Sequence, residues 1–502
     1  MKLRVFTLPL VSILLLALAG VPPTSAQATA QKELLAEAEG SVTIAGKKVD
    51  YRSVVGKLAV KDMTGNASAN IVYTSYIKKT DGKLSDRPLM FCFNGGPGTS
   101  SVFVHLGLFG PRRVLMNDDG LGAPEPIKMI DNEFSMLDLA DLVFIDPVST
   151  GFSSADNAQE ASLFHGLDED TSSVGDFIKA YVAKHGREAS PTYIAGESYG
   201  TTRAASLSSY VQSKGGVKLT GIMLISAVLN FQASRFEPGN DLPFALFLPT
   251  YTASAWHHNK LDKSLGKDLP AILQQAEDFA NGPYTVALQK GNLLTDEERS
   301  VMAKQVAKYA GLSEDFVLKS DLRIEAGSFR GELLRSSGEI IGRLDSRVKA
   351  KAGGGMGGKG GKGGGGDPSN DLIFGLYTQA MTDYMPNVLK FKTDLKYNIS
   401  GQVNPWNYGN AGKNRFANVA TRLRSAMEKD KKLRVFVANG YCDQATPYAA
   451  TRYTIAHMGP RTLTDRVTMT YYDAGHMMYA HLPSLRQLRA DMVKFVTGAV
   501  AD

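Results

Sequence analysis

The chain has 502 residues, of which 43% are hydrophobic, 9% aromatic and 21% charged. This composition is typical of a soluble globular protein and excludes a wholly disordered, collagenous or multi-span membrane chain. With 56 Lys and Arg against 50 Asp and Glu, the formal charge of +6 is too small to indicate a nucleic-acid partner. The length allows several domains or one large α/β unit with an insertion, and neither needs disulfides to form a core.

The first residues are typical of an export signal. Lys2 and Arg4 give a positive start, residues 5–19 are almost wholly apolar, and residues 24–26 form a small-residue cleavage site. A membrane anchor is the alternative, but the apolar run is shorter than the ~20 residues that span a bilayer, and two prolines follow it at once. We therefore predict a signal peptide at 1–26 and a periplasmic or secreted mature protein without a stable membrane anchor.

Apolar stretches after this signal predict strands. Alternating stretches indicate an antiparallel meander, and short continuous apolar runs that end in turns indicate strands buried on both faces of a sheet. Helix-like stretches between these runs favour a mainly parallel α/β sheet. The meander is expected at 41–46, 49–60 and 69–78, the buried strands at 88–93, 142–145, 192–195 and 219–228, and the helices at 170–185 and 201–214.

The strand–helix alternation stops near residue 231. Up to residue 430 we expect mainly helices and a disordered spacer rich in glycine and lysine, and the α/β alternation then resumes. The sequence thus predicts one α/β core, residues 27–230 and 431–502, with an inserted helical cap, residues 231–430. The cap helices are expected at 268–281, 295–310 and 329–350, the spacer at 352–366, and the later strands and helices at 434–437, 447–458, 467–472 and 484–498.

A G-x-S-x-G pentapeptide, residues 196–200, lies between a predicted strand and a predicted helix. A sharp turn there would lift the hydroxyl of Ser198 clear of the sheet, and the flanking glycines remove side chains that would clash. The start of the following helix also directs its dipole and free N–H groups at developing negative charge. Such a pentapeptide is frequent by chance, with an ordinary strand–helix turn as the alternative, but its flanking elements favour a catalytic nucleophile.

A serine nucleophile needs a base, and the base needs an orienting acid. Asp443 lies in the turn after one predicted strand, and His476 lies in the turn after the next. The chain order Ser198, Asp443, His476 is that of the α/β-hydrolases, with each residue just past the carboxyl end of a strand. His481 as the base and Asp473 as the acid are the alternatives, because both lie close by in the sequence.

A glycine-rich turn, residues 94–98, follows the first buried strand. Such a turn can direct backbone N–H groups at the oxyanion of a tetrahedral intermediate. We expect the amide of Gly96 and that of Tyr199, the residue after the nucleophile, to form the oxyanion hole. A tight loop that needs its glycines only for steric reasons is the alternative.

Together these motifs resemble the serine carboxypeptidase family of α/β-hydrolases, in family order and from about residue 88 to about residue 480. The resemblance implies the α/β-hydrolase fold, with a mainly parallel sheet, helices on both faces and an inserted cap. It implies hydrolysis of the C-terminal bond of a peptide or protein with a free C-terminus, through an acyl-enzyme at Ser198 and without a metal or organic cofactor. The matching residues are 94–98, Ser100, Ser101, Gly110, Pro111, 146–148, 151–153, 196–199, Gly440, Asp443 and 475–477.

The resemblance also implies how the substrate is held. Asn94, with Gly95, and a protonated Glu197 would hydrogen-bond the terminal carboxylate of the peptide. Met477 would line the leaving-group pocket. The chain departs from the family at Leu108, where a second Glu usually pairs with the recognition Glu, and this loss weakens carboxylate recognition and the preference for acid.

Cysteine and arginine residues raise further questions. The family commonly has Cys where Thr99 stands and Trp where Cys92 stands, so the nearby family disulfide is absent. We expect Cys92 and Cys442 to be buried thiols, with a disulfide between them as the alternative in an exported chain. Arg112 or Arg113 is a candidate cation for the substrate carboxylate. The sequence has neither CxxC nor HExxH, so no metal site is expected.

Two other functions stay open. An esterase or acyltransferase would use the same triad on non-peptide acyl groups, and Leu108 adds weight to it. Peptides blocked by a C-terminal amide would discriminate it from a carboxypeptidase. A catalytically silent binding protein that kept the fold is the alternative from another class, and it would not be labelled by fluorophosphonates.

Overall fold

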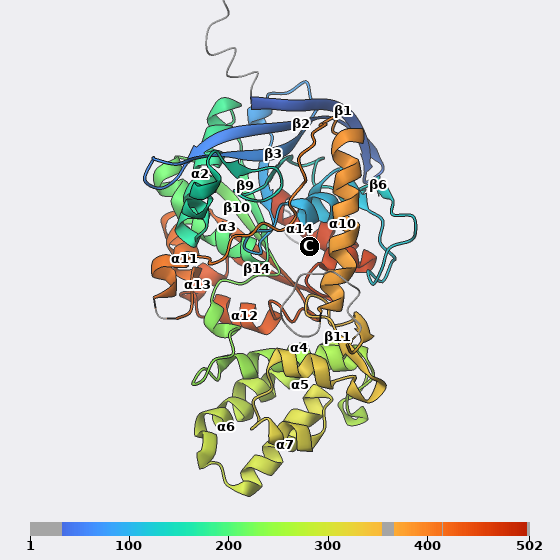
Figure 1. Cartoon of the computed structure of the whole chain (residues 1–502). Helices are drawn as coiled ribbons and strands as arrows, with labels where there is room; N and C mark the ends of the chain where they lie inside the picture. The colour runs from blue at the N-terminus through green and yellow to red at the C-terminus, as the bar shows by residue number, and fades with distance from the viewer. Residues whose placement is uncertain (1–32, 354–365, 414, 499–502) are drawn as a thin grey trace, which may run out of the picture.

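The structure is a computed structural model that describes residues 33–353, 366–413 and 415–498. The predicted signal peptide at 1–26 lies outside the described residues, as does most of the predicted spacer at 352–366. Figure 1 shows a large part built around one sheet and a smaller helical part below it. Among the helices that the structure describes, none is both long and apolar enough to cross a bilayer.

A ten-stranded mixed sheet forms the centre of the molecule, in the order β1-β2-β3-β7-β4-β9-β10-β13-β14, with β8 paired to β3. The first three strands are antiparallel, which confirms the predicted meander, and β3 is also antiparallel to β7. All neighbours from β7 to β14 are parallel, which confirms the mainly parallel core. The strands are β1 (Leu34–Ile44), β2 (Lys47–Lys61), β3 (Ser68–Lys78), β4 (Leu89–Phe93), β7 (Asp141–Ile145), β8 (Ser154–Ala155), β9 (Thr192–Glu197), β10 (Leu219–Ile225), β13 (Arg434–Gly440) and β14 (Val467–Tyr472).

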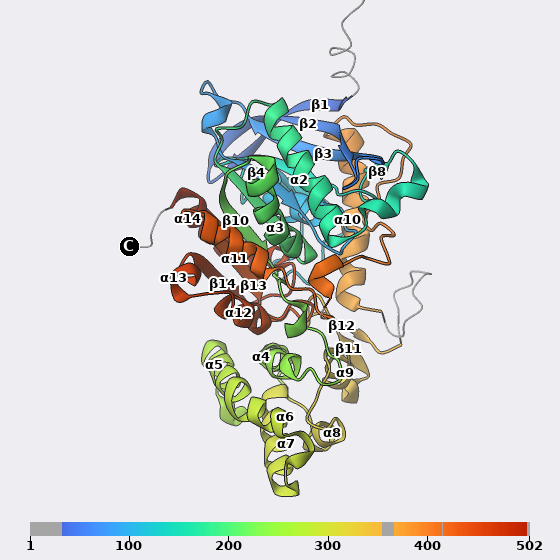
Figure 2. The ribbon, with the colours of Figure 1, turned by 90° about the vertical axis from the view of Figure 1, so that its left-hand side faces the viewer.

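Helices cover both faces of the parallel strands, which explains why these strands are continuous apolar runs. Every residue of β4 is buried: Met90 and Cys92 pack into the core on one face, and Leu89, Phe91 and Phe93 into the core on the other. The first core includes α10 and α14, and the second includes α2, α3 and α11, which lie in front of the sheet in Figure 2. These helices are α2 (Leu167–Lys184), α3 (Tyr199–Tyr210), α10 (Pro368–Asn387), α11 (Ala420–Lys429) and α14 (Leu482–Thr497).

The segment between β10 and β13 contains a group of helices with a core of its own. Apolar residues of α4, α5, α7 and α9 pack into one cluster, and Figures 1 and 2 show this group below the sheet. The helices predicted at 268–281 and 295–310 are present as α5 and α7. The group comprises α4 (Leu242–His257), α5 (Leu269–Phe279), α6 (Thr285–Lys290), α7 (Asp296–Ala310), α8 (Glu314–Lys319) and α9 (Ala326–Glu332).

The prediction of one helix over 329–350 is wrong. Helix α9 ends at Glu332, and the chain then forms a short antiparallel hairpin. Gly338 has a φ of +69°, a left-handed conformation that interrupts any right-handed helix. The turn after the first hairpin strand then contacts the catalytic region, where the carbonyl of Leu344 accepts a hydrogen bond from His476. The hairpin strands are β11 (Glu339–Ile341) and β12 (Lys349–Lys351).

Shorter elements complete the fold. Strands β5 (Arg112–Val114) and β6 (Met129–Asp131) form a separate antiparallel pair. The helix predicted at 447–458 is present as α12 (Tyr448–Ala456), followed by α13 (Arg461–Thr464). The remaining 3-10 and π-helical segments are η1 (Leu84–Asp86), η2 (Val104–Phe109), η3 (Ala158–Phe164), η4 (Val211–Gly215), η5 (Phe231–Ala233), η6 (Lys263–Leu265), η7 (Ala280–Tyr284), η8 (Gly291–Leu293), η9 (Arg335–Ser337), η10 (Gly409–Gly412) and η11 (Met478–Ala480).

Candidate active site

Ser198 forms the turn between β9 and α3 in a conformation that side chains rarely adopt. Its φ and ψ are +60° and −130°, and its N–H donates to the carbonyl of Ile225 on β10 over 2.9 Å. The turn is tight, because a Cβ on Gly196 would lie 2.2 Å from the carbonyl oxygen of Gly200. Strain of this kind persists only where the surrounding structure enforces it, and it is typical of functional residues.

Asp443 and His476 form a buried hydrogen-bonded pair. The Nδ1 atom of His476 and the Oδ2 atom of Asp443 are 2.7 Å apart, and the two side chains are 5% and 0% exposed. The Oδ1 atom of Asp443 accepts the backbone N–H groups of Ala445 and Thr446 over 2.8 and 3.0 Å. The Thr446 hydroxyl donates to Oδ2 over 2.5 Å. These bonds hold the carboxylate in one orientation against the imidazole.

The two members of this pair shift each other's proton affinity. Burial alone would raise the pKa of Asp443, but the charge of His476 and hydrogen bonds from His476 and Thr446 lower it overall. Burial alone would lower the pKa of His476, but the charge and hydrogen bond of Asp443 raise it overall. An imidazole that is fixed and made more basic by a carboxylate is suited to accept a serine proton.

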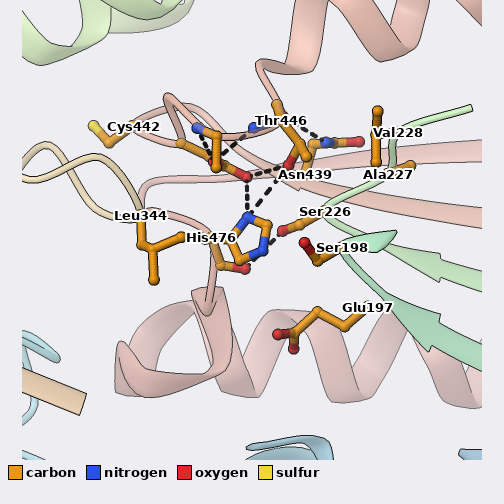
Figure 3. A network of polar contacts seen from close by, with 12 residues as sticks. Glu197, Ser198, Ser226, Ala227, Val228, Leu344, Asn439, Cys442, Thr446 and His476 are labelled. Carbon is orange, nitrogen blue, oxygen red and sulfur yellow. Dashed lines mark hydrogen bonds and ion pairs between the residues drawn. The ribbon is translucent and has the colours of Figure 1, made fainter. Parts of the chain in front are cut away.

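The backbone of His476 is fixed as well. Its N–H donates to the carbonyl of Leu344, and its own carbonyl accepts the hydroxyl of Ser226, both over 2.6 Å. In Figure 3 the side chain of Ser198 points toward the imidazole ring. Because Nδ1 is engaged by Asp443, Nε2 is the ring nitrogen that could accept a proton.

The alternative acid and base have other contacts. Nδ1 of His481 is 2.8 Å from the hydroxyl of Ser484, in the first turn of α14. The carbonyl of Asp473 accepts a hydrogen bond from the guanidinium of Arg347, and the carboxylate paired with His476 is that of Asp443. The geometry therefore favours Asp443 and His476 over these two residues.

The turn at residues 94–98 packs directly against the start of α3. A Cβ on Gly95 would lie 2.4 Å from the backbone nitrogen of Tyr199, so only glycine fits there. Tyr199 is the first residue of α3, and its N–H therefore has no acceptor within the helix. Gly96, Ser198 and Tyr199 line one cavity of about 280 Å³. A carbonyl group that reached Ser198 from this cavity would lie near the N-terminus of α3, where the helix dipole favours negative charge.

Asn94, Glu197 and Tyr479 form a second polar group beside the nucleophile. The Asn94 amide donates to Oε1 of Glu197 over 3.0 Å, and the Tyr479 hydroxyl donates to Oε2 over 2.5 Å. Glu197 is 3% exposed, and this burial raises its pKa to about 7 against the opposing effects of His476, Tyr479 and Asn94. Burial therefore favours the protonated carboxyl up to a higher pH than in an exposed Glu.

Other predicted substrate-binding residues lie apart from the cavity. Neither Asn94, Glu197 nor Met477 lines it, and Met477 is 7% exposed at the start of η11. Leu108 is fully buried in η2. Of the two candidate arginines, Arg112 pairs with Asp131, whereas the guanidinium of Arg113 lies 5.7 Å from the ring centre of Phe134. Neither arginine lines the cavity.

The two cysteines are free and buried, which confirms the expectation of buried thiols. Burial raises the pKa of Cys442 to about 12 and that of Cys92 well above its usual value, so both remain thiols at neutral pH. Within residues 33–353, 366–413 and 415–498, no three His, Cys, Asp or Glu side chains gather so that they could hold a metal ion.

Two further side chains contact the candidate site residues and were not predicted from the sequence. Thr446 orients Asp443, and the pattern of an Asp followed three residues later by Thr, with backbone N–H groups turned toward the carboxylate, is a local signal for this role. Tyr479 follows His476 by three residues and bonds Glu197 from a distant segment. That contact depends on how η11 packs against β9, and no local pattern predicts it.

Comparison with known proteins gives one family. A sequence model of the serine carboxypeptidase family matches residues 51–302, about half of the chain. Pheromone-processing carboxypeptidase KEX1 of Saccharomyces cerevisiae is 35% identical over 126 residues, which cover 24% of this chain and 16% of the yeast protein. Serine carboxypeptidase-like 9 of Arabidopsis thaliana is 26% identical over 187 residues, which cover 35% of this chain and 40% of the plant protein.

A solved structure supports the fold over a longer span. The crystal structure of KEX1(delta)P, a prohormone-processing carboxypeptidase from Saccharomyces cerevisiae, covers 90% of this chain and 92% of its own, with a TM-score of 0.54. The two chains are 17% identical over this span, so the match concerns the fold. With the sheet order, it confirms the predicted α/β-hydrolase fold.

Proposed function

The chain belongs to the serine carboxypeptidase family, and on this premise we propose that it removes C-terminal residues from peptides through an acyl-enzyme at Ser198. The main support is the arrangement around one strained turn. Ser198, Gly96 and Tyr199 line the same cavity, and His476 is hydrogen-bonded to Asp443. No metal or organic cofactor takes part in this proposal.

The proposed chemistry follows from these contacts. Nε2 of His476 takes the proton of Ser198 as its oxygen attacks the peptide carbonyl, and Asp443 stabilises the imidazolium that forms. The N–H groups of Gly96 and Tyr199 bind the oxyanion of the tetrahedral intermediate. The imidazolium then protonates the leaving amine, and a water molecule activated by His476 hydrolyses the acyl-enzyme.

We propose that Asn94 and Glu197, with Gly95, recognise the terminal carboxylate of the substrate. A carboxylic acid donates a hydrogen bond to another carboxylate only when it is protonated, and burial raises the pKa of Glu197 to about 7. Tyr479 bonds the second oxygen of Glu197 and so holds the carboxyl in place. Met477, which follows the base, is proposed to contact the leaving residue.

Ser198→Ala tests the nucleophile. The wild-type protein should release C-terminal residues one at a time from a peptide mixture, read by mass spectrometry, and should react with a fluorophosphonate. The variant should lose both activities, because no other group on this turn can form the acyl-enzyme. Cutting at internal bonds by the wild type, or C-terminal release by the variant, would contradict the proposal.

An esterase or acyltransferase is the second candidate, because Leu108 is apolar and the recognition group does not line the cavity. Paired peptides with a free or an amidated C-terminus separate the two functions. A carboxypeptidase should process the free form at least about tenfold faster, since only that form bonds Asn94 and Glu197. Equal rates, with faster turnover of simple esters, would favour the second candidate.

We further propose that the protein is exported and that helices α4 to α9 act as a cap over the cavity. The N-terminal pattern at 1–26 supports export. Four lining residues support the cap, namely Phe247 of α4 and Ala326, Gly327 and Arg330 of α9. Mass spectrometry of the mature N-terminus tests export: the chain should begin after Ala26, and an intact Met1 in the active protein would contradict it.

A further inference from the structure

The cavity at Ser198 has positive charge in its wall and no negative charge. Arg235, Arg330 and Arg343 line it, and no Asp or Glu is among its lining residues. The three arginines come from separate segments, the loop after η5, helix α9 and the turn after β11. The fold therefore brings together at the nucleophile three cations that are distant in sequence.

These arginines have no carboxylate partner in the part of the chain that the structure describes. Neighbouring arginines are paired, as in Arg323 with Asp241 over 2.7 Å and Arg347 with Asp345 over 2.6 Å. By contrast, no described carboxylate oxygen lies within 4.0 Å of a guanidinium nitrogen of the cavity arginines. Burial and the charge of Arg343 lower the pKa of Arg330, and the opposing charge of Asp367, whose carboxylate accepts the backbone N–H of Arg343, does not offset them.

The position of the cavity assigns it to one side of the scissile bond. Ser198 and Tyr199 line it, whereas Asn94, Glu197 and Met477 do not. If those three residues hold the leaving residue and its carboxylate, the cavity lies on the opposite side of the nucleophile. It then receives the part of the peptide that acylates Ser198.

We propose that this cavity binds the acyl-side residues of the substrate and selects peptides with a Glu or Asp side chain at or beside the residue that acylates Ser198. The inference rests on the proposed carboxypeptidase activity and names its substrate class. Guanidinium groups bind carboxylates through paired, charge-assisted hydrogen bonds. Anionic side chains therefore gain affinity here, and cationic side chains lose it.

The rest of the wall fits such a side chain. Phe231, Phe236 and Phe247 line the cavity and provide an apolar surface for methylene groups. The guanidinium of Arg235 lies 5.6 Å from the ring centre of Phe231, which holds one cation against the wall. A volume of about 280 Å³ suits one or two residues rather than a long segment.

Three matched peptides test the proposal. They end in Glu-Phe, Gln-Phe or Lys-Phe and differ only in the residue that acylates Ser198. At about pH 6, where a Glu side chain is ionised, the wild type should release Phe from the Glu peptide with a kcat/KM about tenfold above the Gln peptide. The Lys peptide should be slowest, and about 0.5 M salt should reduce the Glu preference. Equal values for Glu and Gln, or a preference for Lys, would overturn the proposal.

Variants identify the cavity as the source of the preference. Arg330→Gln and Arg343→Gln should each lower the Glu-to-Gln ratio, and Arg330→Lys should keep part of it, because the charge remains while the planar fork is lost. Arg335→Gln is the matched control, since Arg335 pairs with Glu332 and does not line the cavity. Each ratio is measured within one protein, so a partly unfolded fraction cancels. Ratios that stay at the wild-type value in both Gln variants would overturn the proposal.

Binding to the Ser198→Ala protein separates this inference from the proposed activity. Calorimetry on free and amidated forms of the Glu and Gln peptides needs no turnover. A Glu preference in both forms supports recognition of the side chain, even if the wild type hydrolyses no peptide and the proposed function fails. A preference that disappears on amidation would show that the arginines bind the terminal carboxylate, and it would overturn the assignment to side chains.

Discussion

The groups on the two sides of Ser198 differ in whether they can lose their charge. On one side, Asn94, Glu197 and Tyr479 are at most 3% exposed and hydrogen-bond one another. On the other side, Arg235 and Arg343 are exposed in the wall of an open cavity. The buried carboxyl can avoid the cost of an uncompensated charge by binding a proton, whereas a guanidinium keeps its charge at all ordinary pH values.

This difference teaches which conditions each side responds to. If Glu197 recognises the substrate as proposed, that recognition depends on pH, because burial raises the pKa of Glu197 to about 7. Selection by the arginines depends on salt, because exposed charges are screened within about 10 Å at 0.1 M ionic strength. Glu197 and the cavity arginines are both proposed to position a peptide at Ser198. Variants can therefore test the two groups together or separately.

The largest expected effect comes from a substitution that impairs the proposed base, because the reaction then slows whichever group binds the peptide. Asp443→Asn should lower kcat by about 10³ to 10⁴, equally for Glu and Gln peptides. The amide oxygen can accept the backbone N–H groups of Ala445 and Thr446, which turns the amide NH₂ toward Nδ1 of His476. Nδ1 then has to accept a hydrogen bond, and Nε2 carries the proton in place of a lone pair. Steady-state kinetics on both peptides measure the loss.

Asp473→Asn is the matched control for this prediction. Asp473 lies directly after β14, three residues before His476, but the carboxylate paired with His476 is that of Asp443. The control should stay within about threefold of the wild type, as is usual for a change outside the catalytic contacts. A loss of similar size in both variants would contradict the assignment of Asp443 as the orienting acid.

The sequence was sufficient to predict the fold and the central residues of the candidate site for a geometric reason. Ser198, Asp443 and His476 each follow a strand, and β9, β10, β13 and β14 are parallel neighbours in that order. Turns after parallel neighbouring strands lie at one edge of the sheet. Strand order and local turn motifs thus bring these residues together, and both are written in short stretches of sequence.

What could not be predicted depends on packing between distant segments. Residues 243–255 of α4 are all buried, so this helix lacks the one-sided apolar pattern by which helices are recognised. The bond from Tyr479 to Glu197 and the convergence of Arg330 and Arg343 each join segments without a shared motif. The helix predicted over 329–350 is interrupted at Gly338, where the backbone is left-handed.

A second prediction concerns the pH dependence that the buried carboxyl of Glu197 is expected to cause. The rate on free peptides should rise with pH as His476 loses its proton, and it should fall as Glu197 loses its own. Well above pH 7, where His476 is also deprotonated, kcat/KM should approach a tenfold fall per pH unit in the wild type. Glu197→Gln is neutral at every pH and still has a donor, so this fall should disappear. At pH 8 the variant should gain up to about tenfold relative to the wild type, each normalised at pH 6.

Glu277→Gln is the control for this change, because Glu277 is also buried and burial also raises its pKa, but it pairs with Arg452. Its pH profile should match that of the wild type. If kcat/KM of Glu197→Gln still fell at alkaline pH, another group would have to titrate there. Glu197 would then not be the source of the pH dependence.

The smallest expected effect isolates one hydrogen bond on the buried side. The Tyr479 hydroxyl donates to Glu197 and thereby favours the ionised carboxylate, so it lowers the pKa of Glu197 against the effect of burial. Tyr479→Phe should therefore raise that pKa, and the alkaline fall on free peptides should move to higher pH by about 0.5 to 1 unit, since a hydrogen bond of this kind is worth about 1 kcal/mol. KM should also rise severalfold, because Glu197 is held less firmly.

Tyr472→Phe is the matched control for Tyr479→Phe. It removes another tyrosine hydroxyl that donates to a carboxylate, that of Asp491, over 3.0 Å and away from the cavity. Loss of that bond should lower stability without moving the pH profile, whereas a merely structural role for Tyr479 would give the same result in both variants. A shift of the alkaline fall in Tyr479→Phe alone would show that the hydroxyl tunes Glu197. A shift toward lower pH would contradict the expected rise in the pKa of Glu197, because removing a donor to a carboxylate makes its ionised form less stable.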